Sequence, residues 1–472
     1  MNFDQKLYPA LAWAIMATLS LAVCSRKMCA QTNDISPQQP IPAMVGVNNS
    51  AIPPETYNAD RNGDRMMTPP PVSGQTYPIT LGSQERSNYL RSGVSFTSAY
   101  TDNVLGGATP LSDISYSVTP LIALDETTTR MHLVLDYAPG FTFYQRTSSR
   151  NQADHNAFID FAYRFSPHVT FSAHDEFQKT SNVFNQSADF SRGVVSGGVQ
   201  VPNFSIIVPV ADQLNNFSNV GISYQFALND MVGASGTFSH LHYPNEAQVP
   251  GLADSSSQGG LAFYSHRLGS EQYIGVTYTF QRLMAYPTMG QNETQTQAVL
   301  LFYTVAPTSS KLTISFFGGP QYSDTTLPAP NVPLMSWSGS GGGSLGWQEK
   351  STSFALSYAH IISAGGGLGG AVNQDIGSLS VRQRLTRTLT GSVSGGYAQN
   401  NIIGNVLLGV SNGHSMSGSA FLQQMIGEHV SVQLGYTRVH QSYNDISLIS
   451  STPNTNRESI SISYQFSKPL GR

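Results

Sequence analysis

Ionisable side chains recur at alternate positions along four stretches of this sequence, where the residues between them are largely apolar. They form four pairs in chain order: His132 and Asp136, Asp160 and Arg164, His174 and Glu176, and Arg382 and Arg384. Carboxylate, imidazole and guanidinium groups gathered on one face of a wall can bind ions or set an electric field along a path. The same groups also occur in solvated walls and in structural ion-pair networks with no selective role. The sequence leaves both interpretations open.

Several motifs match covalent or cofactor chemistry only formally. Gly342–Gly346 and Gly409–Gly413 fit G-x-S-x-G, but a nucleophile elbow needs a strand, a strained turn and then a helix, and no helix follows either. Gly365–Gly370 fits G-x-G-x-x-G without a following helix to receive a pyrophosphate, so we expect a flexible exposed loop there. His240 and His242 share one face of a predicted strand, without a clear third metal ligand. We therefore predict no catalytic residue, no metal and no cofactor.

These residues need elements to position them, and period-two alternation dominates the sequence from about residue 90 onward. Apolar residues occupy every second position of 220–226, 274–280, 430–436 and 460–466, and Gly, Ser, Thr or Gln fill the positions between. The outward face of a soluble sheet usually carries Lys, Glu and Arg, but only 11% of this chain is charged. A wet, enclosed lumen fits the small polar face. The apolar face then needs a large apolar surface to cover it, and membrane lipid is the simplest candidate.

The connections between these segments are of two kinds. Tight turns fall near residues 167, 229, 269, 308, 350, 386 and 427, and each interval between them holds a strand, a longer polar connection and a second strand. Short turns at one end and long loops at the other are typical of outer-membrane barrels, whose closure leaves no unpaired backbone in hydrocarbon. We count about eighteen strands, with sixteen as the fallback, and expect an aqueous channel at that size. Aromatic pairs such as Tyr224 and Phe226 precede the tight turns, which predicts an interfacial girdle there.

The first 88 residues have a different composition. An apolar run over 11–23 is too short for a membrane-spanning helix and predicts a signal peptide over 1–30, which would contain both cysteines, Cys24 and Cys29. Residues 31–88 are rich in Pro, Gln and Asn and predict a disordered periplasmic tether, which leaves 89–472 for the barrel. A formal net charge of −4 provides no electrostatic case for a nucleic-acid partner.

The signal sequence, the hairpin period and the final segment Ser461–Phe466 (SISYQF) carry a resemblance. Over roughly 90–466 the chain resembles a Gram-negative outer-membrane β-barrel of the porin type. The resemblance implies an all-β, closed antiparallel up-and-down barrel in the bacterial cell outer membrane, in contact with its lipid and handed to the barrel-assembly machinery through an aromatic-ended last strand. In that family the chain normally ends on the aromatic residue, whereas here Ser467–Arg472 follow.

The implied function is passive diffusion of small hydrophilic solutes through a water-filled lumen, with no enzymatic activity. The eight ionisable residues above would then line the pore, provided that Asp175, which falls on the apolar face, lies near the outer rim. In porins the third long loop folds inward, and here the corresponding connection contains Asp189, Arg192 and Asp212 as constriction candidates. An external flap or an extra hairpin is the alternative.

Two other functions remain open on the sequence. One is an outer-membrane barrel enzyme, phospholipase-like or protease-like, and the other is a secreted β-propeller, which the repeat period of about forty residues would allow. The sequence does not identify the solute, the ion preference or the oligomeric state, although porins often form homo-oligomers.

Overall fold

The computed structural model describes residue 66 and residues 88–470, with gaps at 106–108, 181–211, 246–250, 270, 288–289, 306–311, 327–332, 350, 404–411 and 445–453. The predicted signal peptide over 1–30 lies outside the described residues, as does all of the predicted tether except Met66 and Asn88. The described part belongs to one compact unit, 39–472. No helix within it has the length and apolar character needed to cross a membrane.

The described residues form eighteen strands and one short 3-10 turn, Ser148–Arg150. The strands in chain order are β1 (Tyr89–Thr101), β2 (Asp113–Thr127), β3 (Met131–Tyr144), β4 (Gln152–Arg164), β5 (Val169–Thr180), β6 (Gln213–Ala227), β7 (Asp230–His242), β8 (Asp254–Gly269), β9 (Gln272–Tyr286), β10 (Asn292–Val305), β11 (Leu312–Thr326), β12 (Pro333–Gln348), β13 (Thr352–Ser363), β14 (Val372–Arg384), β15 (Leu389–Ile402), β16 (Gly413–Ile426), β17 (Val430–Tyr443) and β18 (Asn454–Pro469).

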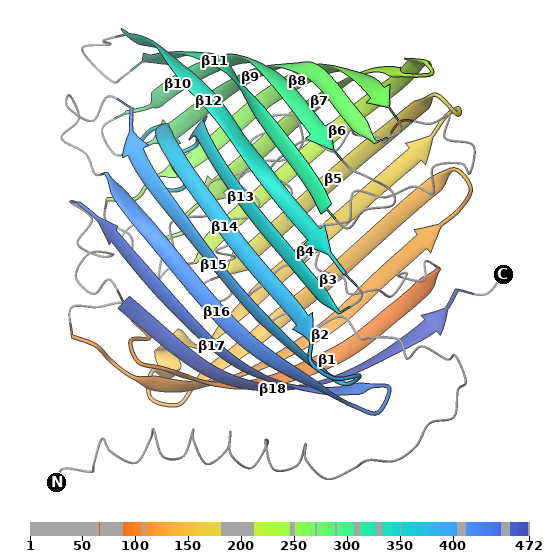
Figure 1. Ribbon diagram of the computed structural model, residues 1–472. Coiled ribbons are helices and arrows are strands. Elements are labelled where there is room, and N and C mark those ends of the chain that lie inside the picture. Colours follow the sequence, from red (N-terminus) through yellow and green to blue (C-terminus); the bar gives the residue numbers. More distant parts are fainter. Residues whose placement is uncertain are drawn as a thin grey trace. The chain divides into compact units, whose positions relative to one another are not determined.

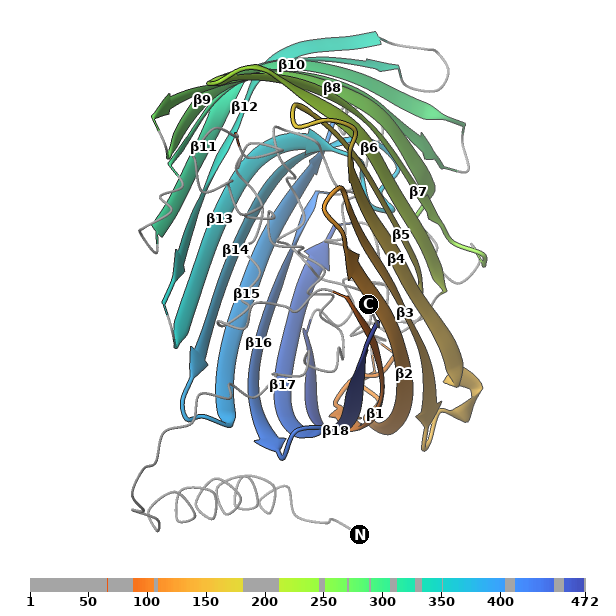
Figure 2. The same ribbon diagram turned by 90° about the vertical axis from the view of Figure 1, so that its right-hand side faces the viewer.

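Each strand pairs antiparallel with the next, and β1 pairs with β18, which closes the sheet into a barrel (Figures 1 and 2). The closing ladder runs from the pair Tyr89 and Pro469 to the pair Thr101 and Arg457. Closure satisfies the two edges that an open sheet would leave unpaired. The predicted eighteen-stranded up-and-down barrel is confirmed, and the β-propeller alternative is wrong because the strands form one continuous ring.

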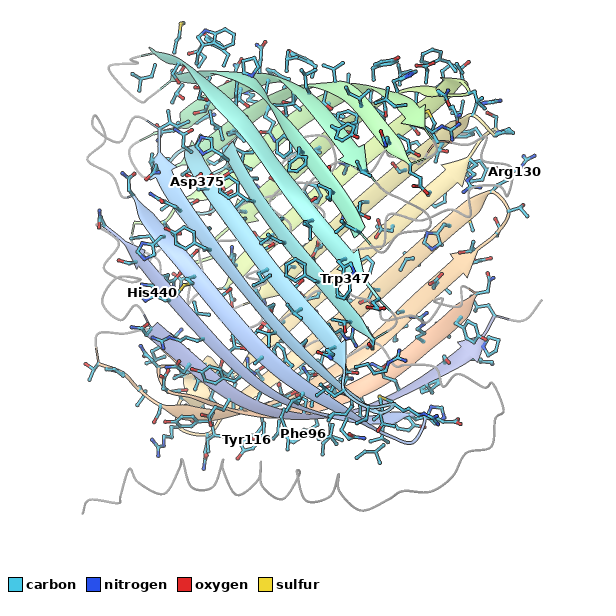
Figure 3. All side chains as sticks on the ribbon, in the orientation of Figure 1. Phe96, Tyr116, Arg130, Trp347, Asp375 and His440 are labelled. Atoms are coloured by element: carbon cyan, nitrogen blue, oxygen red, sulfur yellow. The ribbon has the colours of Figure 1, made fainter. Side chains whose placement is uncertain are left out.

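The two faces of the strands differ as the alternation predicts. In β18, Ile462 is 51% exposed on the outer face, while its neighbour Ser461 is 2% exposed on the inner face. Phe96 and Tyr116, on β1 and β2, likewise point away from the barrel (Figure 3). Large apolar residues are therefore exposed on the outside, and buried Ser, Thr and Gln side chains dominate much of the inside.

The two ends of the barrel also differ. Turns that lead from an even-numbered to the next odd-numbered strand are short, and the connections at the opposite end are mostly longer. We call these ends the turn end and the loop end. The first residue of β1 and the last of β18 both lie at the turn end, as an even strand count requires. Aromatic rings gather at this end, where Tyr163 and Phe165 lie 5.1 Å apart between ring centroids and Tyr224 and Phe226 lie 6.4 Å apart.

Polar clusters limit the outer apolar surface toward the loop end. Oδ1 of Asp375 on β14 accepts a hydrogen bond from the Tyr358 hydroxyl at 2.7 Å. The same oxygen lies 2.9 Å from Nδ1 of His360, and both of these partners are on β13. Arg282 on β9 forms a bidentate pair with Glu293 on β10, with N···O distances of 2.8 and 2.7 Å. All five side chains share the outward face of their strands. The exposed apolar rows thus occupy a band that polar groups border.

The last strand does not stop at the aromatic residue. β18 continues to Pro469, and Ser467 and Lys468 pair with Arg91 and Leu90 of β1. The residues after Phe466, which depart from the family pattern in sequence, therefore complete the closing ladder. The strands of the barrel run from Tyr89 to Pro469, three residues beyond the end of the resemblance at Phe466.

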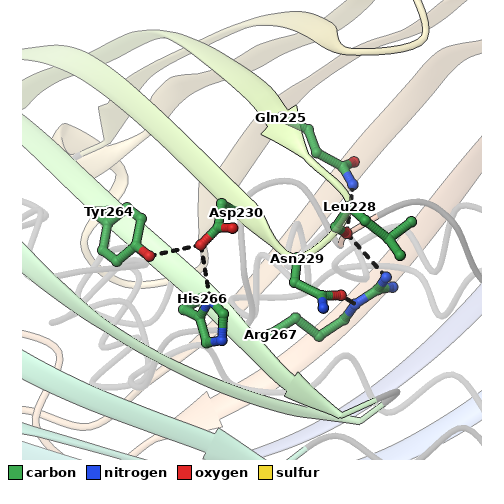
Figure 4. A network of polar contacts seen from close by, with 7 residues as sticks. All are labelled: Gln225, Leu228, Asn229, Asp230, Tyr264, His266 and Arg267. Carbon is green, nitrogen blue, oxygen red and sulfur yellow. Dashed lines mark hydrogen bonds and ion pairs between the residues drawn. The ribbon is translucent and has the colours of Figure 1, made fainter.

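Side chains fix the turn between β6 and β7 from the adjacent strand (Figure 4). Arg267 of β8 donates from Nε to Oδ1 of Asn229 and from Nη2 to the carbonyl of Leu228, both at 3.0 Å. Gln225 donates to the same carbonyl at 3.0 Å. On the outer side, Asp230 bonds to Tyr264 at 2.6 Å and to His266 at 2.7 Å. These contacts satisfy polar groups that the turn itself leaves without ladder partners.

Candidate functional site: the inner wall of the barrel

Six of the eight predicted pore-lining residues share the inner face of three adjacent strands. They are His132 and Asp136 on β3, Asp160 and Arg164 on β4, and His174 and Glu176 on β5. In each strand the alternate positions carry outward apolar residues, such as Leu135, Ile159 and Phe177. We call this set the polar wall. The alternation groups all six on one face of their strands, but it does not show which of them meet, and their role in lining a pore stays a prediction.

Asp160 and His174 meet directly. They are cross-strand partners on β4 and β5, and Nδ1 of His174 lies 2.8 Å from Oδ1 of Asp160. The second carboxylate oxygen of Asp160, Oδ2, is buried and has no hydrogen-bond partner among the described residues. The His174 ring also lies 5.9 Å from that of Phe217 on β6. A carboxylate with one oxygen not engaged by the described part of the chain is suited to attract cations.

Sequence reasoning missed Asp125 of β2, which extends the polar wall toward the turn end. Its carboxylate lies 3.6 Å from Nε2 of His132 and 4.0 Å from Nη2 of Arg91. Asp125 follows the same alternation as the buried Ser115 and Ser117 of its strand, and that pattern was the available signal. It was overlooked because apolar residues occupy both faces of β2 around it.

Arg382 and Arg384 lie on the inner face of β14, at the turn end of that strand. β14 is nine strands from β5 in a ring of eighteen, so the two arginines lie on the opposite side of the ring from His174 and Glu176. The polar wall on β3–β5 contains most of the acidic candidates that face inward. The opposite side of the barrel contains the basic pair Arg382 and Arg384 on β14. Such an arrangement produces a transverse electric field across the interior.

Asp175 faces outward, as its place in the alternation indicates, but it does not lie near the rim. It occupies the middle of β5 and pairs with Ser218 of β6. The Ser218 hydroxyl donates a hydrogen bond to its carboxylate, and Nδ2 of Asn216 donates another at 3.3 Å. The expectation of a rim position is therefore wrong. Hydrogen bonds from the next strand solvate this charge.

A second part of the inner face is apolar, contrary to the expectation that small polar residues line all of it. Its buried members are Met231, Tyr273, Ala298, Leu300, Phe302, Phe317, Ala359, Ile361, Ile376 and Ala398, on β7, β9–β11 and β13–β15. We call this set the inner apolar patch. Met66, from the segment predicted to be a tether, is buried against it, and its backbone N–H donates to Gln225 of β6 at 3.1 Å. This residue of the N-terminal segment therefore lies inside the barrel.

Glycines on neighbouring strands let the large rings of this patch lie close to the wall. A Cβ at Gly275 would overlap the ring of Phe302, its direct partner across the β9–β10 ladder. A Cβ at Gly342 would lie 2.7 Å from the ring of Phe317, its partner across the β11–β12 ladder. Each ring thus covers a glycine of the adjacent strand, which buries apolar area while keeping the ring close to the sheet.

The glycine-rich segment Gly365–Gly370 is packed rather than exposed, so the expectation of a flexible loop is wrong. Leu368 is fully buried, and the carbonyl of Gly367 accepts a hydrogen bond from the N–H of Ala253 at 2.7 Å. Nδ2 of Asn292 donates to the carbonyl of Gly369. Gly367 has a φ of +109° and lies against the Tyr243 ring, where a side chain would clash.

The partners of this segment place it across the loop end of the barrel. Tyr243 follows β7, Ala253 precedes β8 and Asn292 begins β10, whereas the segment itself connects β13 to β14. A connection that reaches from β13 to β7 crosses about a third of the ring. Complete burial there raises the pKa of the Tyr243 hydroxyl.

The constriction loop predicted from the sequence lies almost wholly outside the described residues. Asp189 and Arg192 are among the residues that the structure does not describe. Asp212 is described, immediately before β6 begins at Gln213. The inward fold of that loop stays a prediction.

The motifs considered for covalent or metal chemistry occupy unsuitable positions. Gly342–Gly346 lies within β12, without the turn and helix of a nucleophile elbow, and most of Gly409–Gly413 lies outside the described residues. His240 and His242 stack on the outer face of β7, and Nδ1 of His242 lies 2.5 Å from Oδ2 of Asp254. Across the described ranges, no three His, Cys, Asp or Glu side chains are grouped as a metal site requires.

No family model matches the chain, and no curated protein matches it. Among solved structures, it is similar to the outer membrane protein OpdK from Pseudomonas aeruginosa, at 9% identity over 80% of this chain and 99% of that one, with a TM-score of 0.39. It is also similar to OccAB4 of Acinetobacter baumannii, at 8% identity over 82% and 100% of the two chains, with a TM-score of 0.39. A third similar structure is the ferric citrate transporter FecA, at 8% identity over 81% and 80%, with a TM-score of 0.40.

Proposed function

We propose that this chain is an outer-membrane channel that lets small hydrophilic solutes diffuse passively through its lumen. The observation that carries the proposal is the closed eighteen-strand ring with its apolar rows exposed on the outside. Exposed rows such as Val220, Ile222, Tyr224 and Phe226 would be strongly unfavourable in water, and a bilayer is the environment that stabilises them.

The inner wall supports a charge-dependent path. The polar wall, with Asp125 beside it, presents carboxylates on β2–β5, and Arg382 and Arg384 present positive charge from β14. This arrangement draws cations toward one wall and anions toward the other. Gly365–Gly370 at the loop end would limit the size of what enters. No covalent chemistry or cofactor is part of this proposal.

Planar-bilayer recording of the detergent-folded chain tests the proposal. We expect stepwise current increases that scale with salt concentration, and none from the same chain after heat unfolding or from detergent alone. A mature chain that stays monomeric in water without detergent, or that inserts without producing current steps, would contradict the proposal.

A further inference from the structure

Histidines are concentrated at one end of the outer face. Six of the eleven histidines in the chain lie within three residues of the loop end of their strand, on β4, β7, β13, β16 and β17. In these strands they share a face with exposed apolar residues such as Phe238, Leu356 and Tyr436. Figure 3 shows one of them, His440, at this end of the barrel. We call the set the histidine belt, and its members are His155, His240, His242, His360, His414 and His440.

Adjacent strands hold four of these rings by their Nδ1 atoms. Nδ1 of His242 lies 2.5 Å from Oδ2 of Asp254, and Nδ1 of His360 lies 2.9 Å from Oδ1 of Asp375. Two further rings are held by a tyrosine hydroxyl at 3.0 Å and by an asparagine side-chain oxygen at 3.1 Å. A ring that donates from Nδ1 to a carboxylate can donate from Nε2 only after it gains a second proton. Protonation therefore gives the belt new hydrogen-bond donors as well as positive charge.

Few charged groups face the belt from its own and adjacent strands. The cations are Lys179, the cross-strand partner of His155, and Arg438, on the same strand as His440. The carboxylates are Asp254, Asp375 and Glu458. The other titratable neighbours are tyrosines, which stay neutral between pH 5 and 8: Tyr137, Tyr358, Tyr397 and Tyr436. Histidine changes charge within that range, so protonation of six rings changes the sign of this surface from negative to positive.

Two pairs of rings in the belt lie close together. The ring centroids of His240 and His242 are 6.2 Å apart, and those of His414 and His440 are 5.4 Å apart. Two imidazolium groups at such separations repel each other, and an anion bound beside both of them offsets that repulsion. Each pair is therefore suited to share one phosphate group.

The belt borders the exposed apolar rows of the outer face. Met416, two residues from His414 on the same face, is 49% exposed, and Tyr358, two residues from His360, is 53% exposed. A lipid beside a membrane barrel places its acyl chains against such rows and its headgroup at their polar border. The belt thus lies where a headgroup phosphate would meet this surface.

We propose that the histidine belt binds the phosphate groups of lipids in the leaflet around the loop end, and binds them more tightly when its imidazoles are protonated. A headgroup is the ligand, rather than free phosphate, because acyl chains have apolar rows to lie against directly beside the belt. The inference rests on the membrane location proposed above, but it concerns the outer face and not the route through the lumen.

Spin-labelled lipids test this contact. The full chain is reconstituted in phosphatidylcholine vesicles that contain either phosphatidylglycerol or diacylglycerol with the same labelled acyl chain. Electron spin resonance then measures the fraction of label immobilised by the protein at pH 8 and at pH 5. We expect the preference for phosphatidylglycerol over diacylglycerol to rise about two-fold at the lower pH, because added surface charge attracts the anionic headgroup.

Replacing all six belt histidines by glutamine should abolish this rise and leave planar-bilayer conductance at the wild-type value. The half variants H155Q/H240Q/H242Q and H360Q/H414Q/H440Q should each lose about half of it, which keeps the test usable if the six-fold variant fails to fold. The matched control is H168Q/H266Q/H429Q at the turn end. It should retain the rise, since two of its residues lie in turns beyond the apolar rows.

Four results would overturn the proposal. They are a wild-type preference that does not change with pH, an unchanged rise in both half variants, an equal loss in the control, and complete loss of the rise in excess inorganic phosphate, which would show a site for the free ion. Absence of wild-type current in planar bilayers would instead count against the axial channel. Altered migration of the unheated chain in gel electrophoresis identifies any variant that fails to fold.

Discussion

At the scale of single residues, the interior is organised by a few contacts between neighbouring strands. Asp160 is bonded to His174 and keeps one carboxylate oxygen without a partner in the described part of the chain. Asp175, on the other face of β5, is bonded to Ser218 and Asn216. These two aspartates lie on adjacent strands but face opposite sides of the wall. They therefore separate the effect of an inward charge from that of an outward one.

We expect Asp160→Asn to lower the ratio of cation to anion permeability about four-fold, because the charge favours a cation and disfavours an anion by the same amount. A unit charge about 10 Å from an ion path in a water-like dielectric contributes about 0.4 kcal/mol. Reversal potentials in a salt gradient measure the ratio. Asp175→Asn is the matched control and should leave the ratio unchanged, because that carboxylate faces outward. Equal shifts in both variants would show that the polar wall does not border the ion path.

At the scale of elements, the end of β18 and the segment Gly365–Gly370 have structural roles that their sequences do not indicate. β18 continues past its terminal aromatic residue because β1 starts at Tyr89 and needs partners for its first three residues. Gly365–Gly370 crosses the loop end because glycine tolerates both the positive φ of Gly367 and the close approach of Tyr243. Burial of Leu368 and two hydrogen bonds from distant connections hold this crossing in place.

Deleting residues 366–369 should raise single-channel conductance, since the deletion removes a segment that crosses the loop end. The conductance of the deletion variant is compared with that of the wild-type chain in planar bilayers at the same salt concentration. Gly369→Ser keeps the segment's length, and its Cβ would lie 3.7 Å from Pro287, an ordinary contact, so we expect wild-type conductance. An unchanged or smaller conductance after deletion would place the limiting constriction elsewhere.

At the scale of the whole molecule, the barrel reverses the usual distribution of side chains in a globular protein. Large apolar side chains lie outside, and many hydroxyl and amide side chains lie inside. Complementary contacts such as the Ser394–Ser419 pair, with Oγ atoms 2.7 Å apart, recur along the inner face. Apart from the part of β12 that extends beyond its pairing with β13, the closed ladder pairs the strand backbones within the protein. In the membrane location proposed above, lipid would supply the apolar surroundings that a protein core supplies elsewhere.

This arrangement predicts that an arginine introduced on the outer face destabilises the protein more than one introduced at the same depth on the inner face. Val220 is the central residue of β6 and faces outward, and Asn219 beside it faces inward. Val220→Arg should lower the free energy of unfolding by about 2–4 kcal/mol, the cost of arginine at the bilayer midplane. Asn219→Arg should cost much less, because the inner face is polar there. Urea titration of both variants in lipid vesicles measures the difference, and equal costs would contradict a lipid-facing outer surface.

Much of the fold followed from the sequence because it depends on local rules. Period-two alternation shows which side chains share a face, so all eight ionisable candidates were assigned to the inner face from residue types alone. Tight turns at regular spacing show which strands form hairpins. The number of alternating segments led to about eighteen strands, and an even count puts both termini at one end. These features need only neighbouring residues and the requirement that no strand edge face hydrocarbon.

Contacts between distant parts of the chain were decided only by the tertiary structure. Alternation cannot show that Asp125 meets His132, that Met66 is buried against the inner apolar patch, or that Gly365–Gly370 reaches β7 and β10. It also cannot show that β12 extends beyond the stretch that pairs with β13. Each of these depends on strand register and on what lies across the interior. A two-residue period determines only the direction of a side chain, whereas its partners depend on how the closed ring brings distant segments together.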